Sequence, residues 1–167
     1  MLFRSIKVRV TYPSNFALST ARASGLPDPF VRIQAFRTKS FNGLPDASVR
    51  TGVGISEIMG LEDGESYYIR AYVEQDGDTV RDAWESWGYY RAGSAAANPF
   101  VPLAVKAMAP GNASAPVEVE IRDCDTDNDL LPDSYEYAKY GDFRFGLETL
   151  ICSKLRGNTH HEVAVNN

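Results

Sequence analysis

The chain has 167 residues, of which 44% are hydrophobic, and its 22 acidic residues outnumber 17 lysines and arginines to give a formal net charge of −5. This length and hydrophobic content predict one well-packed domain, with room for a small appendage, and argue against wholesale disorder. The negative charge argues against a nucleic-acid partner, which needs a basic face, and no apolar run approaches the length of a membrane span.

Alternation of hydrophobic and polar residues predicts β-strands along the first half of the chain. Turn signals rich in Gly, Pro and Asp separate these segments. They are residues 5–12 (S-I-K-V-R-V-T-Y), 30–36 (F-V-R-I-Q-A-F), 48–58, where the alternation is looser and predicts one or two short strands, and 66–73 (S-Y-Y-I-R-A-Y-V). The last is the strongest candidate, because aromatic and β-branched residues favour strands.

This strand candidate runs directly into a stretch of regularly spaced acids, E-Q-D-G-D-T-V-R-D-A-W-E at residues 74–85. Carboxylates stand at the first, third, fifth, ninth and twelfth places, and the seventh place offers a backbone carbonyl. That is the ligand spacing of a calcium loop of the EF-hand kind. The predicted ligands are Glu74, Asp76, Asp78, Val80, Asp82 and Glu85. Glu74 is longer than the Asp that usually occupies the first place.

An aromatic group follows the acidic stretch and consists of Trp84, Trp87, Tyr89 and Tyr90. Such a group could stack on a sugar ring. It could equally pack over the core or brace the acidic loop, and the sequence leaves these alternatives open.

Two further strands are predicted over residues 100–108 and 117–121, and the second of them runs into D-T-D-N-D-L-L-P-D-S-Y-E at residues 125–136. The acids fall at the same five places as in the first stretch, 51 residues further on. A hard cation with oxygen ligands suits this set, which contains no His or Cys. The predicted ligands here are Asp125, Asp127, Asp129, Leu131 (through its carbonyl), Asp133 and Glu136.

The distribution of charge favours ion binding over two ordinary solvated acidic turns. Residues 74–85 and 123–136 together hold 11 of the 22 acids, so the rest of the chain has an excess of lysine and arginine. Bare carboxylates this close repel one another unless a cation lies between them. We therefore interpret both stretches as Ca²⁺ loops.

Weaker patterns predict a short helix over residues 137–140, another over 147–155, and a loose tail over 159–167. His160 and His161 lie in that tail, where they are expected to be solvated. Cys124 and Cys152 are compatible either with a disulfide or with two buried thiols.

The pattern as a whole predicts an all-β fold, an antiparallel β-sandwich of about seven strands with two EF-hand-like calcium loops and a short helical C-terminal segment. Because no helix of crossover length separates the strands, parallel pairing is not expected. The predicted organisation is a sandwich over residues 1–122 containing the loop at 74–85, a calcium loop with a helical appendage over 123–158, and the tail over 159–167.

Two stretches resemble prealbumin-like β-sandwich modules of bacterial surface proteins, namely the collagen-adhesin B-type and carboxypeptidase regulatory-like domains. They are G-L-E-D-G-E-S-Y-Y-I-R-A-Y at 60–72 and G-L-P-D-A-S-V at 43–49. The resemblance covers roughly residues 5–122 and implies a stalk or spacer module.

The second acidic stretch resembles the calcium motifs of thrombospondin type 3 repeats and dockerins. Leu130 stands where Gly usually makes the sharp turn, and Pro132 lacks the N–H that joins paired EF-hands. These departures favour a single-loop type over a paired calcium sensor. Because strands separate the two loops, a dockerin-like role is not expected.

No phosphate-binding glycine loop or nucleophile motif is present, so we do not expect an enzyme. The sequence predicts a calcium-stabilised structural module (a spacer, stalk or filament subunit) of a secreted or cell-surface protein, with any export signal upstream of this chain. The alternative is a calcium-dependent carbohydrate-binding or adhesion module. Expected partners are other protein subunits, neighbouring domains or further copies of the chain, and, in the alternative, a glycan.

Overall fold

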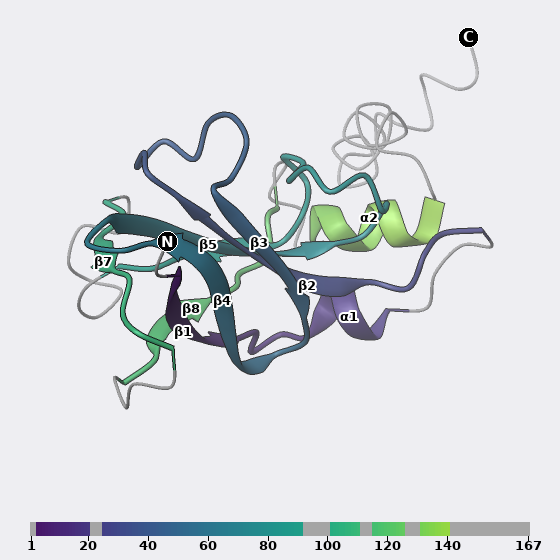
Figure 1. Cartoon of the computed structure of the whole chain (residues 1–167). Coiled ribbons are helices and arrows are strands. Elements are labelled where there is room, and N and C mark those ends of the chain that lie inside the picture. The colour runs from purple at the N-terminus through teal and green to yellow at the C-terminus, as the bar shows by residue number, and fades with distance from the viewer. Residues whose placement is uncertain (1–2, 21–24, 92–100, 111–114, 126–130, 141–167) are drawn as a thin grey trace, which may run out of the picture.

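The structure is a computed structural model that describes residues 3–20, 25–91, 101–110, 115–125 and 131–140 (Figure 1). The described residues form eight strands and two helices. The strands are β1 (Phe3–Thr11), β2 (Phe30–Phe36), β3 (Ala47–Thr51), β4 (Gly54–Glu62), β5 (Ser66–Glu74), β6 (Trp87–Tyr89), β7 (Ala104–Lys106) and β8 (Val117–Glu120). The helices are α1 (Phe16–Ser19) and α2 (Asp133–Tyr140).

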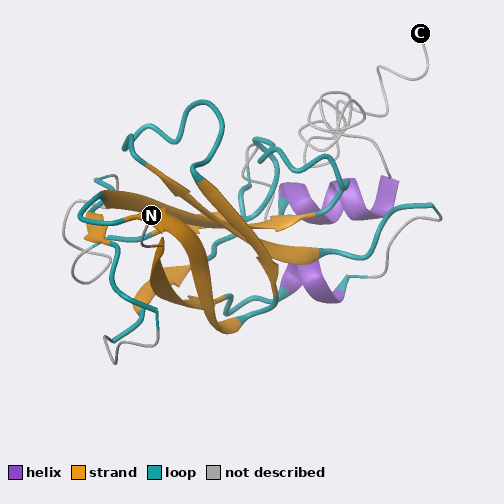
Figure 2. Cartoon of the chain, viewed as in Figure 1, coloured by secondary structure: helices purple, strands orange, loops and turns teal. Residues whose placement is uncertain are grey.

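The strands form two sheets, which are packed face to face (Figure 2). The first has the order β4-β1-β8, in which β1 is antiparallel to β4 and parallel to β8. The second has the order β3-β2-β5-β6, and β7 also pairs with β5. β6 pairs with β5 at residues 70–72, and β7 pairs with it at residues 66–68, so these short strands extend the sheet one after the other.

The core lies between the sheets and follows from the alternation of side chains along each strand. In β1, Ile6, Val8 and Val10 are buried. The facing side chains of the second sheet are Val31, Ile33, Ala35, Tyr67, Ile69, Ala71 and Val73, all fully buried. Each large apolar side chain buried in this way contributes about 1.5–3 kcal/mol, and this burial holds the sheets together.

Backbone bonds close the gap between the two sheets along one side. Trp87 N donates to Arg122 O at 3.0 Å, and Arg122 N donates to Trp87 O at 3.1 Å, which joins β6 to the end of β8. A second pair of bonds joins Ser5 and Met108, at 2.8 and 2.9 Å. These contacts pair edge groups that would otherwise be open to another chain.

Both helices lie side by side at one end of the sheets (Figure 1). Phe16 of α1 and Tyr135 of α2 meet edge to face, with ring centroids 5.4 Å apart. Beneath them the Tyr12 hydroxyl, at the end of β1, accepts the Ala17 N–H at 2.8 Å and donates to the carboxylate of Asp123. The hydroxyl thereby links the start of α1 to the segment that leads into α2.

The two sheets and the small helical content confirm the predicted all-β, sandwich-like fold. The described residues form eight strands where about seven were predicted, and the prediction of purely antiparallel pairing is wrong for β1 and β8. These two strands are joined by most of the chain, which runs through the other strands, so their parallel pairing needs no crossover helix. The second helix begins at Asp133, four residues before its predicted start, and α1 was not predicted.

Several predictions fall on residues outside those described. They concern Asp127, Asp129, Cys152, the helix over 147–155 and the tail with its two histidines. Among the described helices, none is long and apolar enough to cross a membrane.

Candidate metal site

The first acidic loop curls around the side chain of Glu74, the last residue of β5, which is fully buried. Glu74 Oε1 accepts the Gly77 N–H at 2.9 Å, and Oε2 accepts the Thr79 N–H at 3.0 Å. Gly77 and Thr79 both have positive φ angles, 88° and 71°. This conformation suits glycine and is uncommon for threonine, so the loop holds a tight turn with its N–H groups aimed at one carboxylate.

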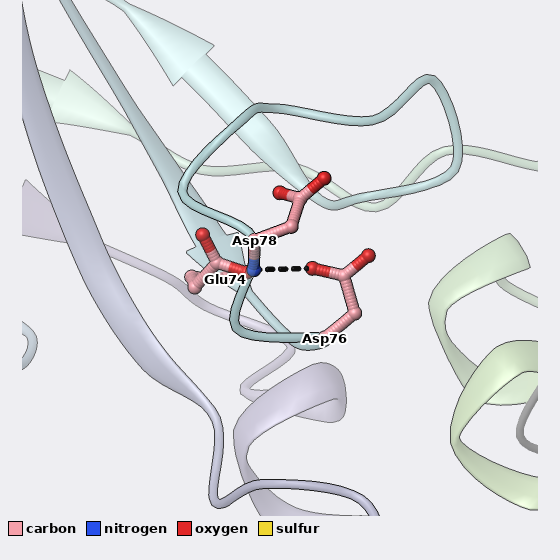
Figure 3. Close-up of side chains that lie close together, drawn as sticks. All are labelled: Glu74, Asp76 and Asp78. Carbon is pink, nitrogen blue, oxygen red and sulfur yellow. Dashed lines mark hydrogen bonds between the residues drawn. The ribbon is translucent and has the colours of Figure 1, made fainter.

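The next two acids fold back on the same turn. Asp76 Oδ1 accepts the Asp78 N–H at 3.0 Å (Figure 3), and Asp78 Oδ1 accepts the Val80 N–H at 2.7 Å. These local bonds fix the two carboxylates. One oxygen from each of Glu74, Asp76 and Asp78 lies within 4.8 Å of the others. Because calcium–oxygen distances are about 2.3–2.6 Å, two oxygens on one ion lie at most about 5 Å apart. The acidic triad can therefore hold a metal ion.

The remaining three predicted ligands of this loop take different positions. Val80 is 60% exposed, Asp82 is half-buried, and Glu85 is fully buried. Glu85 Oε1 accepts the Gln75 N–H at 2.9 Å, and Oε2 accepts the Asp82 N–H at 2.9 Å. The side chain of Glu85 thus joins the two ends of the loop by accepting backbone N–H groups from both. The sequence pattern gave no sign of this closing role.

Burial of so many acids makes their charged forms unfavourable. Burial raises the pKa of Glu85 to about 9, and the nearby charges of Glu74 and Asp76 contribute. Burial also raises the pKa values of Glu74 and Asp82. One counter-charge is present, because Arg32 Nε lies 3.7 Å from Glu74 Oε2. A divalent cation at the triad would favour the ionised carboxylates.

The same loop is packed against α2. Trp84, only 2% exposed, stacks on Tyr137 with ring centroids 3.7 Å apart and an interplanar angle of 22°. Gln75 Nε2 donates to Ser134 O at 3.2 Å. The two ends of the acidic loop are therefore part of the packed interior at this end of the sandwich, whereas its middle, from Gly77 to Val80, is exposed.

Four of the six predicted ligands of the second acidic stretch are described: Asp125, Leu131, Asp133 and Glu136. Asp133 and Glu136 lie in the first turn of α2 and are 5% and 6% exposed. Asp133 N donates to Cys124 O at 2.8 Å, which joins the residue before this stretch to the start of α2. A helix N-terminus stabilises acids in its first turn even without an ion. The acidic residues at positions 133 and 136 therefore also have a structural explanation.

The four residues of the predicted aromatic group lie in three different surroundings. Trp84 is buried against α2, which matches the bracing interpretation. Tyr90 packs against the core between the sheets. Trp87 and Tyr89, at alternate positions of β6, share the opposite, outer face of the second sheet, with ring centroids 5.6 Å apart. Only these two remain candidates for contact with a ligand on that face.

Comparisons of the chain with known protein families, characterised proteins and solved structures found no match.

Proposed function

We propose that the chain is a calcium-stabilised structural module of a secreted or cell-surface protein, acting as a spacer, stalk unit or filament subunit. The observation that carries this proposal is the triad of Glu74, Asp76 and Asp78 on a loop at the end of a sheet strand. The triad offers oxygen donors alone, which suit a hard cation. An extracellular setting, where calcium is abundant, fits such a loop.

Calcium takes 6–8 oxygen ligands, so the triad needs further donors. In our proposal the first ion is completed by the Val80 carbonyl, Asp82, Glu85 and water. Glu85 keeps lone pairs for an ion because each of its oxygens accepts one described backbone bond. The proposed second ion is held by Asp125, Asp127, Asp129, the Leu131 carbonyl, Asp133 and Glu136.

The ion would act on stability. Without it, the folded state must bury carboxylates that repel one another; with it, that repulsion becomes attraction to a shared cation. When free calcium is about a hundred times the dissociation constant, one site adds roughly 2.7 kcal/mol to the free energy of unfolding. This is a large share of the roughly 5–15 kcal/mol that a typical domain has.

Calorimetric titration with calcium tests the proposal. The parent should bind two ions, and Asp78→Asn should lose one. The Asn side chain can still accept the Val80 N–H, so the variant removes charge while keeping the turn. Glu65→Gln, an exposed acid outside both loops, is the matched control and should bind as the parent does. Absence of binding to the parent, or parental binding by Asp78→Asn, would contradict the proposal.

The outer face of the second sheet favours one alternative, a carbohydrate-binding or adhesion module. Arg81 lies over the Trp87 ring at 4.4 Å, and Arg70 lies over the Phe41 ring at 5.8 Å. In the described part of the chain, neither guanidinium forms an ion pair with a carboxylate. Stacked arginines present their N–H groups in a fixed orientation. An acidic sugar would supply both the carboxylate and a ring for this face.

An acidic oligosaccharide and its neutral methyl ester separate this alternative from the spacer role. Binding of the acidic form alone, weakened by Arg81→Gln, supports it. Arg37→Gln is the control, since Arg37 also lies near a ring but is already paired with Asp46 and Glu62. If neither sugar binds, the alternative is wrong.

A further inference from the structure

The two acidic stretches, far apart in the sequence, meet at a buried hydrogen bond between Gln75 and Ser134. Gln75 stands between Glu74 and Asp76 of the triad, and Ser134 is the second residue of α2. Gln75 Nε2 donates to Ser134 O at 3.2 Å, and both residues are fully buried. The backbone that positions two triad carboxylates is thus bonded directly to the first turn of the helix.

The far end of the loop makes a second connection. Trp84, next to Glu85, stacks on Tyr137 of α2. The Glu85 carbonyl oxygen lies 3.6 Å from the Cys124 thiol that donates to it, in the segment that leads into α2. Both ends of the loop therefore contact the helix or its approach.

Glu85 makes these two connections depend on one another. Its carboxylate binds the backbone N–H of Gln75 and of Asp82, so a shift of the loop displaces Gln75 and Trp84 together. α2 has eight residues, fewer than the roughly 12–15 that an isolated helix needs for even marginal stability in water. Its order must come from packing, and the loop provides much of the described packing surface.

We propose that ion binding at the triad and docking of α2 are thermodynamically linked, so that the ion fixes α2 onto the sandwich. The inference rests on the proposed function, because it needs an ion at Glu74, Asp76 and Asp78. Linkage is reciprocal. A change that loosens α2 must therefore weaken ion binding, by at most the factor by which the ion favours docking.

Two measurements on the full chain test the linkage. Hydrogen exchange of the α2 amides is compared in calcium and in chelator, and calcium affinity is measured by calorimetry. In the parent, calcium should slow α2 exchange at least about fivefold, the lower end of typical coupling. In Asp78→Asn, which keeps only the proposed second ion at the start of α2, this slowing should be clearly smaller than in the parent. Tyr137→Ala, which removes the stacked ring, should weaken calcium binding by a similar factor.

Two further variants keep the test decisive. Gln75→Met removes the donor at similar volume and should also weaken calcium binding, which guards against poor folding of Tyr137→Ala. Val49→Ala, in the edge strand β3, is the control for general loss of packing and should bind calcium as the parent does. The linkage would be overturned if Tyr137→Ala and Gln75→Met both bind calcium as tightly as the parent does and if calcium leaves the exchange of the α2 amides unchanged. The proposed calcium site would not be contradicted by that result. No calcium binding by the parent would overturn both.

Discussion

Gly88 in β6 lies so close to Glu120 in β8 that a Cβ atom at Gly88 would stand 1.9 Å from the Glu120 carbonyl oxygen. The neighbouring Trp87 and Arg122 exchange two backbone bonds. The absence of a side chain at residue 88 is therefore what allows the two sheets to join along this side, just beyond the acidic loop.

Gly88→Ala should destabilise the chain by about 3 kcal/mol or more, because backbone on both sides must move to relieve the clash. The free energy of unfolding in urea measures this loss. Gly52→Ala is the matched control, since a Cβ there meets nothing within 4 Å and Gly52 has no positive φ angle. It should change stability by no more than about 0.5 kcal/mol. Equal effects of the two substitutions would refute this interpretation of the β6–β8 junction.

In chelator, the acidic loop should make stability fall as pH rises. The folded state raises the pKa of Glu85 from 4.5 to about 9, so between these values the folded chain binds more protons than the unfolded chain. The contribution of protonated Glu85 to the free energy of unfolding is complete below about pH 4.5. It is lost as pH rises towards 9, by at most about 1.4 kcal/mol per pH unit for one group.

Urea unfolding of the parent and Glu85→Gln at pH 5, 6.5 and 8 measures this effect. The parent should lose stability relative to the variant as pH increases, and saturating calcium should reduce the difference in slope. A parent that gains stability relative to Glu85→Gln as pH rises in chelator would show that the sign is wrong.

Arg32 should matter most when calcium is absent. Its guanidinium, 3.7 Å from Glu74, is the counter-charge of a fully buried carboxylate. Arg32→Gln should therefore lower the free energy of unfolding in chelator by about 1–3 kcal/mol, with a smaller loss in calcium. Arg50→Gln is the control, because Arg50 lies over the same Phe30 ring without pairing with Glu74. Equal losses in calcium and chelator would argue against this role.

Local patterns in the sequence were enough to place most strands, because alternation reports directly which face is buried. The strand over residues 30–36 was predicted at its observed bounds. β6 was missed because three residues containing Gly88 carry no alternation, and its strand geometry comes from pairing with β5 and Arg122. The parallel pairing of β1 with β8 could not be predicted from local patterns either, because it joins two strands that are more than 100 residues apart in the sequence.

The sequence does contain a pattern that indicates the start of α2 at Asp133. The Pro132 carbonyl accepts the first helical N–H groups, and Asp133 and Glu136 occupy the first turn. Proline and acidic residues in these places are typical of helix starts. Within the site, spacing alone predicted that Glu74, Asp76 and Asp78 share one turn. The closing role of Glu85 and the Trp84–Tyr137 stack follow from tertiary packing, which no spacing rule contains.

Thermal unfolding in calcium and in chelator, on the parent and on Asp78→Asn, tests the central claim most directly. Calcium should raise the melting temperature of the parent by several degrees, since about 1 kcal/mol corresponds to roughly 2–4 °C for domains of about this size. The rise should be clearly smaller in Asp78→Asn and unchanged in Glu65→Gln. If calcium leaves the melting temperature of the parent unchanged, the claim that calcium stabilises this fold is contradicted. The acidic loop would then be a structural turn that needs no ion.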